Sequence, residues 1–171
     1  MPDTQGRARS RLGALARLAL AVAAGAALGL GQAPWALTWV GFAGLLAIVA
    51  LFARSRGPRA ALACGWGAGV GYFALVLNWV TEPFQVDAAT TGWMAPFALV
   101  LLAAGLALFW ALAFWCAGRA APRRRLFALV VAWSAVELAR AYVLTGFAWA
   151  TLGSLWAPSP ALQWAAFVGT H

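Results

Sequence analysis

Apolar stretches separated by short polar segments make up nearly the whole chain. They cover residues 18–31, 34–53, 60–80, 93–116 and 126–144, and a sixth stretch begins at residue 161. A helix needs about 20 apolar residues to cross the hydrocarbon core of a bilayer, and the second to fifth stretches have about that length. The pattern predicts an all-α fold: a polytopic transmembrane helix bundle of five spans plus a truncated sixth.

The two ends of this pattern are the least regular. The first stretch is short, and it reaches a full span only if Arg17 extends its guanidinium to the membrane surface. An arginine-rich start followed by an apolar stretch and small residues is also typical of a cleavable signal peptide, which stays open as an alternative. The last stretch, residues 161–170, is about half a span. We therefore expect the transmembrane domain to be incomplete at its C-terminus.

The composition favours a membrane protein and excludes an ordinary soluble domain. Hydrophobic residues make up 64% of the chain and charged residues 9%, against roughly 25% charged residues in average globular proteins. The net charge of +8 is compatible in principle with nucleic acid, but no aromatic residues alternate with the basic ones as a base-stacking surface requires. The sequence therefore predicts a membrane environment and no nucleic acid partner.

The distribution of arginine predicts the orientation of the helices. All twelve basic residues are arginine, and ten of them form three clusters between apolar stretches. The clusters are Arg7, Arg9 and Arg11, then Arg54, Arg56 and Arg59, then Arg119, Arg123, Arg124 and Arg125. The other connections, near Gln32, at 81–92 and at 145–160, contain no basic residue. Because basic residues collect in short cytoplasmic loops, we expect residues 1–17 to be a basic cytoplasmic segment. Residues 18–171 then form the transmembrane domain, with these other connections facing outward.

Side chains that carry chemistry are scarce. Cys64 and Cys116 lie within predicted spans, without a neighbouring histidine or the CxxC spacing of a metal or redox site. We interpret both as small core residues. The single histidine, His171, ends the chain. The sequence contains no recognisable catalytic triad, carboxylate pair or phosphate-binding loop, and it predicts no metal and no cofactor.

Glycine and tryptophan are placed unevenly. Gly65 and Gly69 are four residues apart within one span, as are Gly67 and Gly71. Such pairs let helix backbones approach closely, although a groove for an acyl chain is an alternative. Many tryptophans fall near predicted outward ends, namely Trp35, Trp39, Trp79, Trp93, Trp149, Trp156 and Trp164. They indicate an interfacial aromatic belt or a surface that handles lipid.

Two charged residues interrupt the fifth apolar stretch. Glu137 and Arg140 lie roughly 17 Å and 21 Å from its start, at about 1.5 Å per helical residue. They are therefore in the half of the membrane farther from Arg125. A spacing of three places both on one helix face, where they can pair. Because a charge in hydrocarbon is costly, we expect an ion pair in the outer leaflet. This pair either fixes helix packing or lets Arg140 bind a lipid phosphate.

Several short motifs follow one another in a defined order. Glu137 and Arg140 form a Glu-x-x-Arg span, followed by Thr-Gly-Phe-Ala-Trp at 145–149 and Leu-Gly at 152–153. Earlier in the chain are the glycine-rich stretch 65–72, Asn-Trp-Val at 78–80 and Trp-Met-Ala-Pro-Phe at 93–97, and later the segment 160–169. In this order, over about residues 20–171, the motifs resemble those of the apolipoprotein N-acyltransferase family.

The resemblance implies a multi-pass enzyme of the bacterial inner membrane with a periplasmic active face. Such an enzyme takes an acyl chain from a phospholipid and passes it to the α-amino group of the lipid-modified N-terminal cysteine of an apolipoprotein. The family's catalytic Glu, Lys and Cys belong to a nitrilase-like domain, and no residue of this chain matches them. We therefore expect a monomeric membrane part that is inactive alone. Its candidate lipid-contact residues are Asn78, Trp79, Glu137, Arg140 and Trp149.

The chain departs from the family pattern at two places, and two other classes of protein are alternatives to this family. Ala148 occupies a position where the family usually has proline, which makes the turn less rigid, and the turn at residues 31–34 is a loose match. A small polytopic transporter or channel subunit also has intramembrane charges and glycine-rich helices. However, the chain has no second Glu-x-x-Arg span that would indicate a repeat. A structural or assembly protein without chemistry is the remaining alternative.

Overall fold

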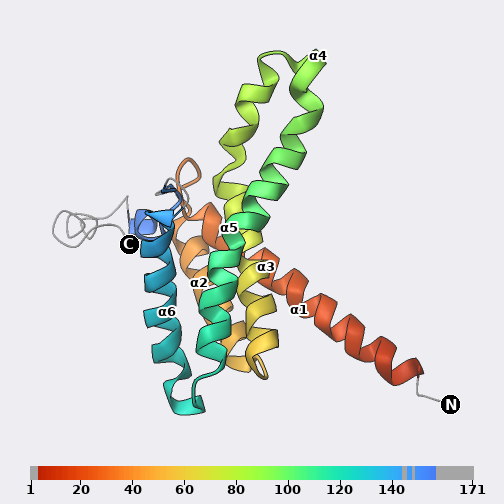
Figure 1. Ribbon diagram of the computed structural model, residues 1–171, viewed down its shortest axis with the longest axis vertical. Helices are drawn as coiled ribbons and strands as arrows, with labels where there is room; N and C mark the ends of the chain where they lie inside the picture. Colours follow the sequence, from red (N-terminus) through yellow and green to blue (C-terminus); the bar gives the residue numbers. More distant parts are fainter. Residues whose placement is uncertain (1–3, 144–145, 148, 157–171) are drawn as a thin grey trace.

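The computed structural model describes residues 4–143, 146–147 and 149–156, and the regular structure in these ranges is entirely helical (Figure 1). The longer helices are α1 (Thr4–Leu30), α2 (Thr38–Arg54), α3 (Pro58–Val76), α5 (Ala95–Gly118) and α6 (Arg125–Arg140). Short helical turns are η1 (Asn78–Gln85), α4 (Ala88–Thr91), η2 (Gly92–Met94), η3 (Pro122–Arg124) and η5 (Leu152–Trp156). The predicted all-α class is confirmed.

Three helical segments of the described chain are long and apolar enough to cross a membrane. They are Leu12–Leu30 within α1, Pro58–Val76, which is α3, and Ala88–Gly118, which contains α5. The first therefore has spanning length even with Arg17 inside it. In contrast, α2 has 17 residues and α6 has 16. These are about 26 Å and 24 Å of helix, less than the hydrocarbon thickness of about 30 Å. Both are shorter than the sequence predicts.

Helix α3 lies at the centre of the bundle, packed between α1 and α5. Its glycines explain this position. A Cβ at Gly65 or Gly69 would collide with atoms of α5, and a Cβ at Gly67 or Gly71 would collide with atoms of α1. The predicted close packing is confirmed, and each glycine pair faces a different helix. Neighbouring helices, rather than an acyl chain, occupy both faces.

Aromatic side chains fill the space between α3, α5 and α6. Trp110 stacks on Tyr72 with ring centroids 5.0 Å apart, and it meets Trp133 edge-on at 4.8 Å. Phe114 contacts Trp133 at 5.0 Å and Phe52 of α2 at 5.4 Å, again edge-on. Such pairs add a geometric preference to the burial of large apolar surface. The aromatic core therefore fixes how four helices meet.

The two cysteines have different environments. Cys64 is buried in the core, whereas Cys116 is exposed. The prediction of a core position is wrong for Cys116 because α5 buries only one face. Leu108, Leu112 and Cys116 are all exposed and follow one another at intervals of four residues. This spacing places them along the side of α5 that faces away from the core.

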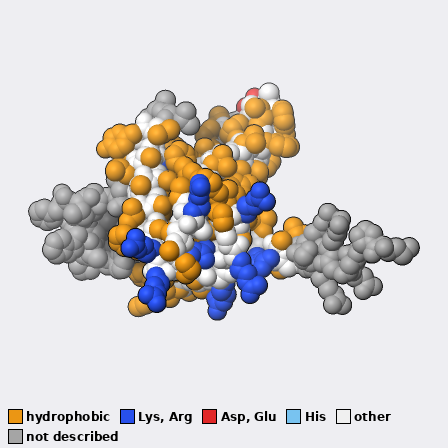
Figure 2. All heavy atoms as spheres, turned by 60° about the horizontal axis from the view of Figure 1, so that its bottom comes forward, with side chains coloured by type: hydrophobic (Ala, Val, Ile, Leu, Met, Phe, Trp, Pro, Cys, Tyr) orange, Lys and Arg blue, Asp and Glu red, His pale blue; other side chains and the backbone are white. Residues whose placement is uncertain are grey.

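Charged side chains are separated between the two ends of the bundle. Arginines gather at the end formed by the α2–α3 and α5–α6 connections (Figure 2). The hairpin formed by η1, α4 and α5 projects at the other end (Figure 1). The hairpin carries Glu82 in the middle of η1 and Asp87 just before α4, both exposed. Basic and acidic side chains thus lie toward opposite ends of the described bundle.

Candidate functional site

Helix α6 ends at Arg140, four residues before the end predicted at residue 144. The N–H of Phe147 donates to the carbonyl of Arg140 at 2.9 Å, so the chain folds back over the helix end. Gly146 permits this reversal with φ of +76°, in the left-handed region that favours glycine. A Cβ there would also overlap the carbonyl of Ala141. We call the described residues 146–147 and 149–151 the return loop.

The guanidinium of Arg140 lies beneath the return loop and holds its backbone. Nη1 donates to the carbonyls of Phe147 at 2.9 Å and Trp149 at 2.6 Å. Nη2 donates to the carbonyl of Ala150 at 3.2 Å and to Glu137 Oε2 at 2.8 Å. The side chain of Arg140 is 1% exposed and that of Glu137 is 3% exposed. The predicted ion pair is therefore confirmed, and it forms a buried anchor for three carbonyls.

Aromatic groups surround this ion pair. The second carboxylate oxygen, Glu137 Oε1, accepts a hydrogen bond from Trp110 Nε1 at 2.8 Å. The Arg140 guanidinium carbon lies 5.3 Å from the centroid of the Phe73 ring, a distance at which cation–π attraction operates. The two charges thus compensate each other and both terminal nitrogens of Arg140 are bonded, while its buried Nε has no hydrogen-bond partner.

A second set of polar groups reaches the return loop from α3 and from the turn after α1. Gln32 Nε2 donates to the hydroxyl of Tyr72 at 2.9 Å and to the carbonyl of Thr151 at 3.3 Å. The Tyr72 hydroxyl donates to the carbonyl of Ala150 at 3.1 Å. Gln32 is therefore buried rather than facing water. We refer to Gln32, Tyr72, Trp110, Glu137 and Arg140 together as the polar network.

Only part of the polar network has a signal in the sequence. Glu137 and Arg140 have a local signal, since two charges three residues apart in an apolar stretch call for an explanation. For Tyr72, the signal is a hydroxyl inside a span, because a buried tyrosine usually needs a hydrogen-bond partner. No such signal marks Trp110 among eleven tryptophans, or Gln32, whose partners are far away in the sequence.

The remaining candidate residues lie on the outer surface beside the return loop. The rings of Trp79 and Trp149 are 5.9 Å apart between centroids, and these residues are 50% and 65% exposed. Asn78, the first residue of η1, is also exposed. The structure therefore brings Trp79 together with Trp149 at the surface, and it places Glu137 and Arg140 underneath.

Some predictions fall outside the described residues. They concern Thr145, Ala148, the sixth apolar stretch from residue 161 with Trp164 and His171, and the side chains of Ser154 and Trp156. Within the described ranges, no group of three or more histidine, cysteine or acidic residues lies close enough together to hold a metal ion. The polar network instead holds backbone carbonyls, so it positions the loop.

Together, the fold and this site define a membrane-embedded helical domain with a loop anchored at the end away from its arginine clusters. Residues 24–171 match the apolipoprotein N-acyltransferase N-terminal domain, and the chain belongs to that family. An apolipoprotein N-acyltransferase of Caulobacter vibrioides is 46% identical over 158 residues, which cover 90% of this chain and 30% of the relative. One of Chromobacterium violaceum is 35% identical over 168 residues, covering 96% of this chain and 32% of the relative.

A third relative, the apolipoprotein N-acyltransferase of Rhodopseudomonas palustris, is 40% identical over 102 residues, or 58% of this chain and 19% of the relative. The chain spans about a third or less of the length of these curated relatives. The resemblance seen in the sequence is confirmed, and these matches give no support to a transporter or channel subunit.

Proposed function

We propose that this chain is the membrane domain of an apolipoprotein N-acyltransferase. The whole enzyme would move an acyl chain from a phospholipid to the α-amino group of the lipid-modified N-terminal cysteine of an apolipoprotein. The observation that carries this proposal is the anchored return loop, which lies within the region matched by the family. No residue of the chain matches the family's catalytic Glu, Lys and Cys, so we assign the chemistry to a nitrilase-like domain outside these 171 residues.

We further propose that the domain crosses the bacterial inner membrane five times, as a monomer with a cytoplasmic N-terminus. Segregation of arginine to one end supports this orientation, since basic residues mark the cytoplasmic side. The return loop and the hairpin tip with Asp87 then face the periplasm. The short helices α2 and α6 complete their crossings through the adjoining turn at residues 31–37 and the return loop.

In this arrangement Trp79 and Trp149 form the surface that the lipid substrates meet. Indole rings prefer the headgroup level of a membrane, and the exposed pair lies next to a loop whose backbone is fixed. Arg140 contributes from below by positioning that loop, because both of its terminal nitrogens already donate to protein acceptors. The alternative in which its guanidinium binds a lipid phosphate would require these bonds to break.

Cysteine labelling tests the orientation. In a cysteine-free background, Leu37→Cys and Asp87→Cys should react with a membrane-impermeant maleimide added from the periplasm, and Ser154→Cys should do so as well. Leu37 is the reporter for the turn after α1 because it is exposed, whereas Gln32 is buried. Arg56→Cys and Arg123→Cys should react only after the membrane is permeabilised. Labelling of the arginine positions in intact cells would reverse the assignment.

Reconstitution tests the activity. Residues 1–171 alone, with phospholipid and a diacylated lipopeptide, should form no triacylated product. The same residues joined to the following part of the Caulobacter vibrioides relative should form it. In that chimera, Trp149→Ala should lower turnover by about tenfold or more, since misplacing a reacting group by about 1 Å can cost that much.

Trp39→Ala is the matched control for this loss. Trp39 is 86% exposed, and its ring contacts Phe42 rather than the Trp79–Trp149 pair, so the control should retain full turnover. Turnover by the isolated chain that disappears with Cys64→Ala or Cys116→Ala would show that the chemistry has been assigned to the wrong part of the protein.

A further inference from the structure

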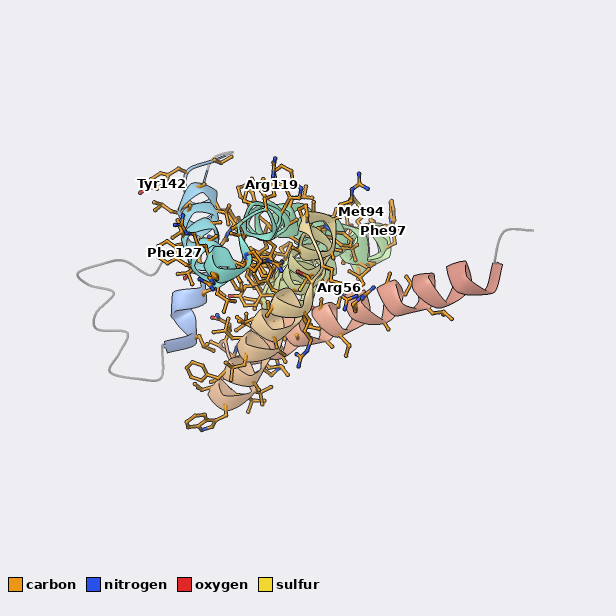
Figure 3. All side chains as sticks on the ribbon, turned by 90° about the horizontal axis from the view of Figure 1, so that it is seen from below. Arg56, Met94, Phe97, Arg119, Phe127 and Tyr142 are labelled. Carbon is orange, nitrogen blue, oxygen red and sulfur yellow. The ribbon has the colours of Figure 1, made fainter. Side chains whose placement is uncertain are left out.

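A cavity of about 720 Å³ opens at the basic end of the bundle, far from the return loop. Its wall includes four arginines from separate parts of the chain: Arg17 of α1, Arg54 at the end of α2, Arg56 of the α2–α3 connection and Arg125 of α6. Figure 3 shows Arg56 beside α1. No acidic residue lines the cavity. We call it the basic groove.

One of these arginines gives the groove a fixed wall. Arg125 Nη1 donates to the carbonyl of Ser55 at 3.0 Å, and Nη2 donates to Ser55 Oγ at 2.9 Å. Its guanidinium carbon also lies 4.8 Å from the centroid of the Phe52 ring. These contacts attach the α2–α3 connection to the start of α6. This part of the groove wall is therefore held in place by contacts between helices.

The other three arginines present positive charge without a protein counter-charge. Arg17, Arg54 and Arg56 are exposed, and the ion pair found among the described residues joins Glu137 and Arg140 instead. Guanidinium groups donate paired hydrogen bonds to phosphate oxygens. Several unpaired guanidiniums around one cavity therefore fit an anionic, phosphate-bearing ligand.

The position of the groove favours a lipid as the source of that phosphate. Arg54 is the last residue of α2 and Arg125 the first of α6, so the groove lies where the apolar helices end and headgroups begin. Leu20 of α1 is exposed and lies about one turn beyond Arg17 on the same side of the helix, toward the apolar part of α1. It offers an apolar surface for acyl chains, which a free phosphate or an acidic peptide would not use.

We propose that the basic groove binds the headgroup of an anionic phospholipid, with its acyl chains running along the apolar part of α1 from Leu20 onward. Basic pockets between membrane helices recognise headgroups that carry two phosphates, as in cardiolipin. This lipid is separate from the acyl donor at the return loop. The inference does not depend on acyl transfer and needs only that this end of the bundle lies at headgroup depth.

Native mass spectrometry of the purified 171-residue chain tests the proposal, with cardiolipin, phosphatidylethanolamine and glycerol phosphate as separate probes. The groove variant carries Arg17→Gln, Arg54→Gln and Arg56→Gln. Its control carries Arg119→Gln, Arg123→Gln and Arg124→Gln, which removes the same charge from the same end but outside the groove wall. We expect the groove variant to bind cardiolipin at least about tenfold more weakly, since each arginine near an anionic surface contributes roughly fivefold. The control should change by less than about threefold.

A second variant distinguishes a loss of lipid binding from a loss of folding. Arg17→Lys, Arg54→Lys and Arg56→Lys keep the charge but lose the paired hydrogen bonds, and together they should weaken cardiolipin binding severalfold. Equal losses in the groove variant and its control, or unchanged binding by the lysine variant, would overturn the proposal. It would also be overturned if the chain bound phosphatidylethanolamine as well as cardiolipin, or if glycerol phosphate competed fully.

Discussion

Replacing Arg140 with methionine should destabilise the protein by about 3–5 kcal/mol, the usual cost of removing one partner of a buried ion pair. The change leaves Glu137 charged and buried. It also removes the arginine donors from the carbonyls of Phe147, Trp149 and Ala150, of which Ala150 keeps a hydrogen bond from the Tyr72 hydroxyl. Thermal unfolding in detergent measures the loss, and hydrogen exchange at the return loop shows where it arises. We expect exchange there to rise before the bundle itself unfolds.

The double variant Glu137→Gln with Arg140→Met separates the two contributions. It removes the unpaired charge, so it should recover part of the stability, but the carbonyls of Phe147 and Trp149 still lack the donors that Arg140 supplies, and exchange at the return loop should stay fast. If Arg140 served only to neutralise Glu137, the double variant would restore both stability and slow exchange. That result would contradict the assignment of Arg140 as the anchor of the loop.

The second large effect is expected from Gly25→Ala, which should destabilise the contact between α1 and α3 by about 3 kcal/mol, at the upper end for overpacking of a core. A Cβ at Gly25 would overlap the backbone carbonyl of Ala68. Unlike the end of a flexible side chain, a helix backbone cannot move aside locally, so the two helices must separate along their contact. Thermal unfolding and the fraction of monodisperse protein in detergent measure this loss.

Gly105→Ala provides the matched control. Gly105 lies within α5, and a Cβ there would have no neighbour within 4 Å. Alanine also has a higher helix propensity than glycine, by about 1 kcal/mol, so this variant should be as stable as the parent or slightly more so. If both substitutions destabilised the protein equally, a need for helix flexibility, rather than close packing, would explain why glycine occupies these positions.

The features that sequence could predict are those with a local pattern. Apolar stretches predict helices, and a spacing of three predicts that Glu137 pairs with Arg140. The glycines of α3 predict close packing through their spacing of four. Spacing alone could not indicate that Gly65 and Gly67 face different helices, because that depends on where α1 and α5 lie.

The features that sequence missed depend on contacts between distant segments. The length of α6 is one, since its end is set by Gly146 and by bonds from Arg140 to the return loop rather than by where the apolar residues stop. The burial of Gln32 is another, because its partners Tyr72 and Thr151 lie far along the chain. Sequence placed Trp79 and Trp149 at the same membrane surface, but only the structure shows their rings in contact.

The polar network makes the return loop depend on helices that lie far apart in the sequence. Its backbone is held by groups from the turn after α1, from α3 and from α6, and α5 supplies the indole that fixes Glu137. Arg140 reaches the loop from the adjoining helix, whereas the bonds from Gln32 and Tyr72 require α1 and α3 to be in place as well. A change that displaces α1 or α3 therefore alters the surface that carries Trp149 without touching the loop itself.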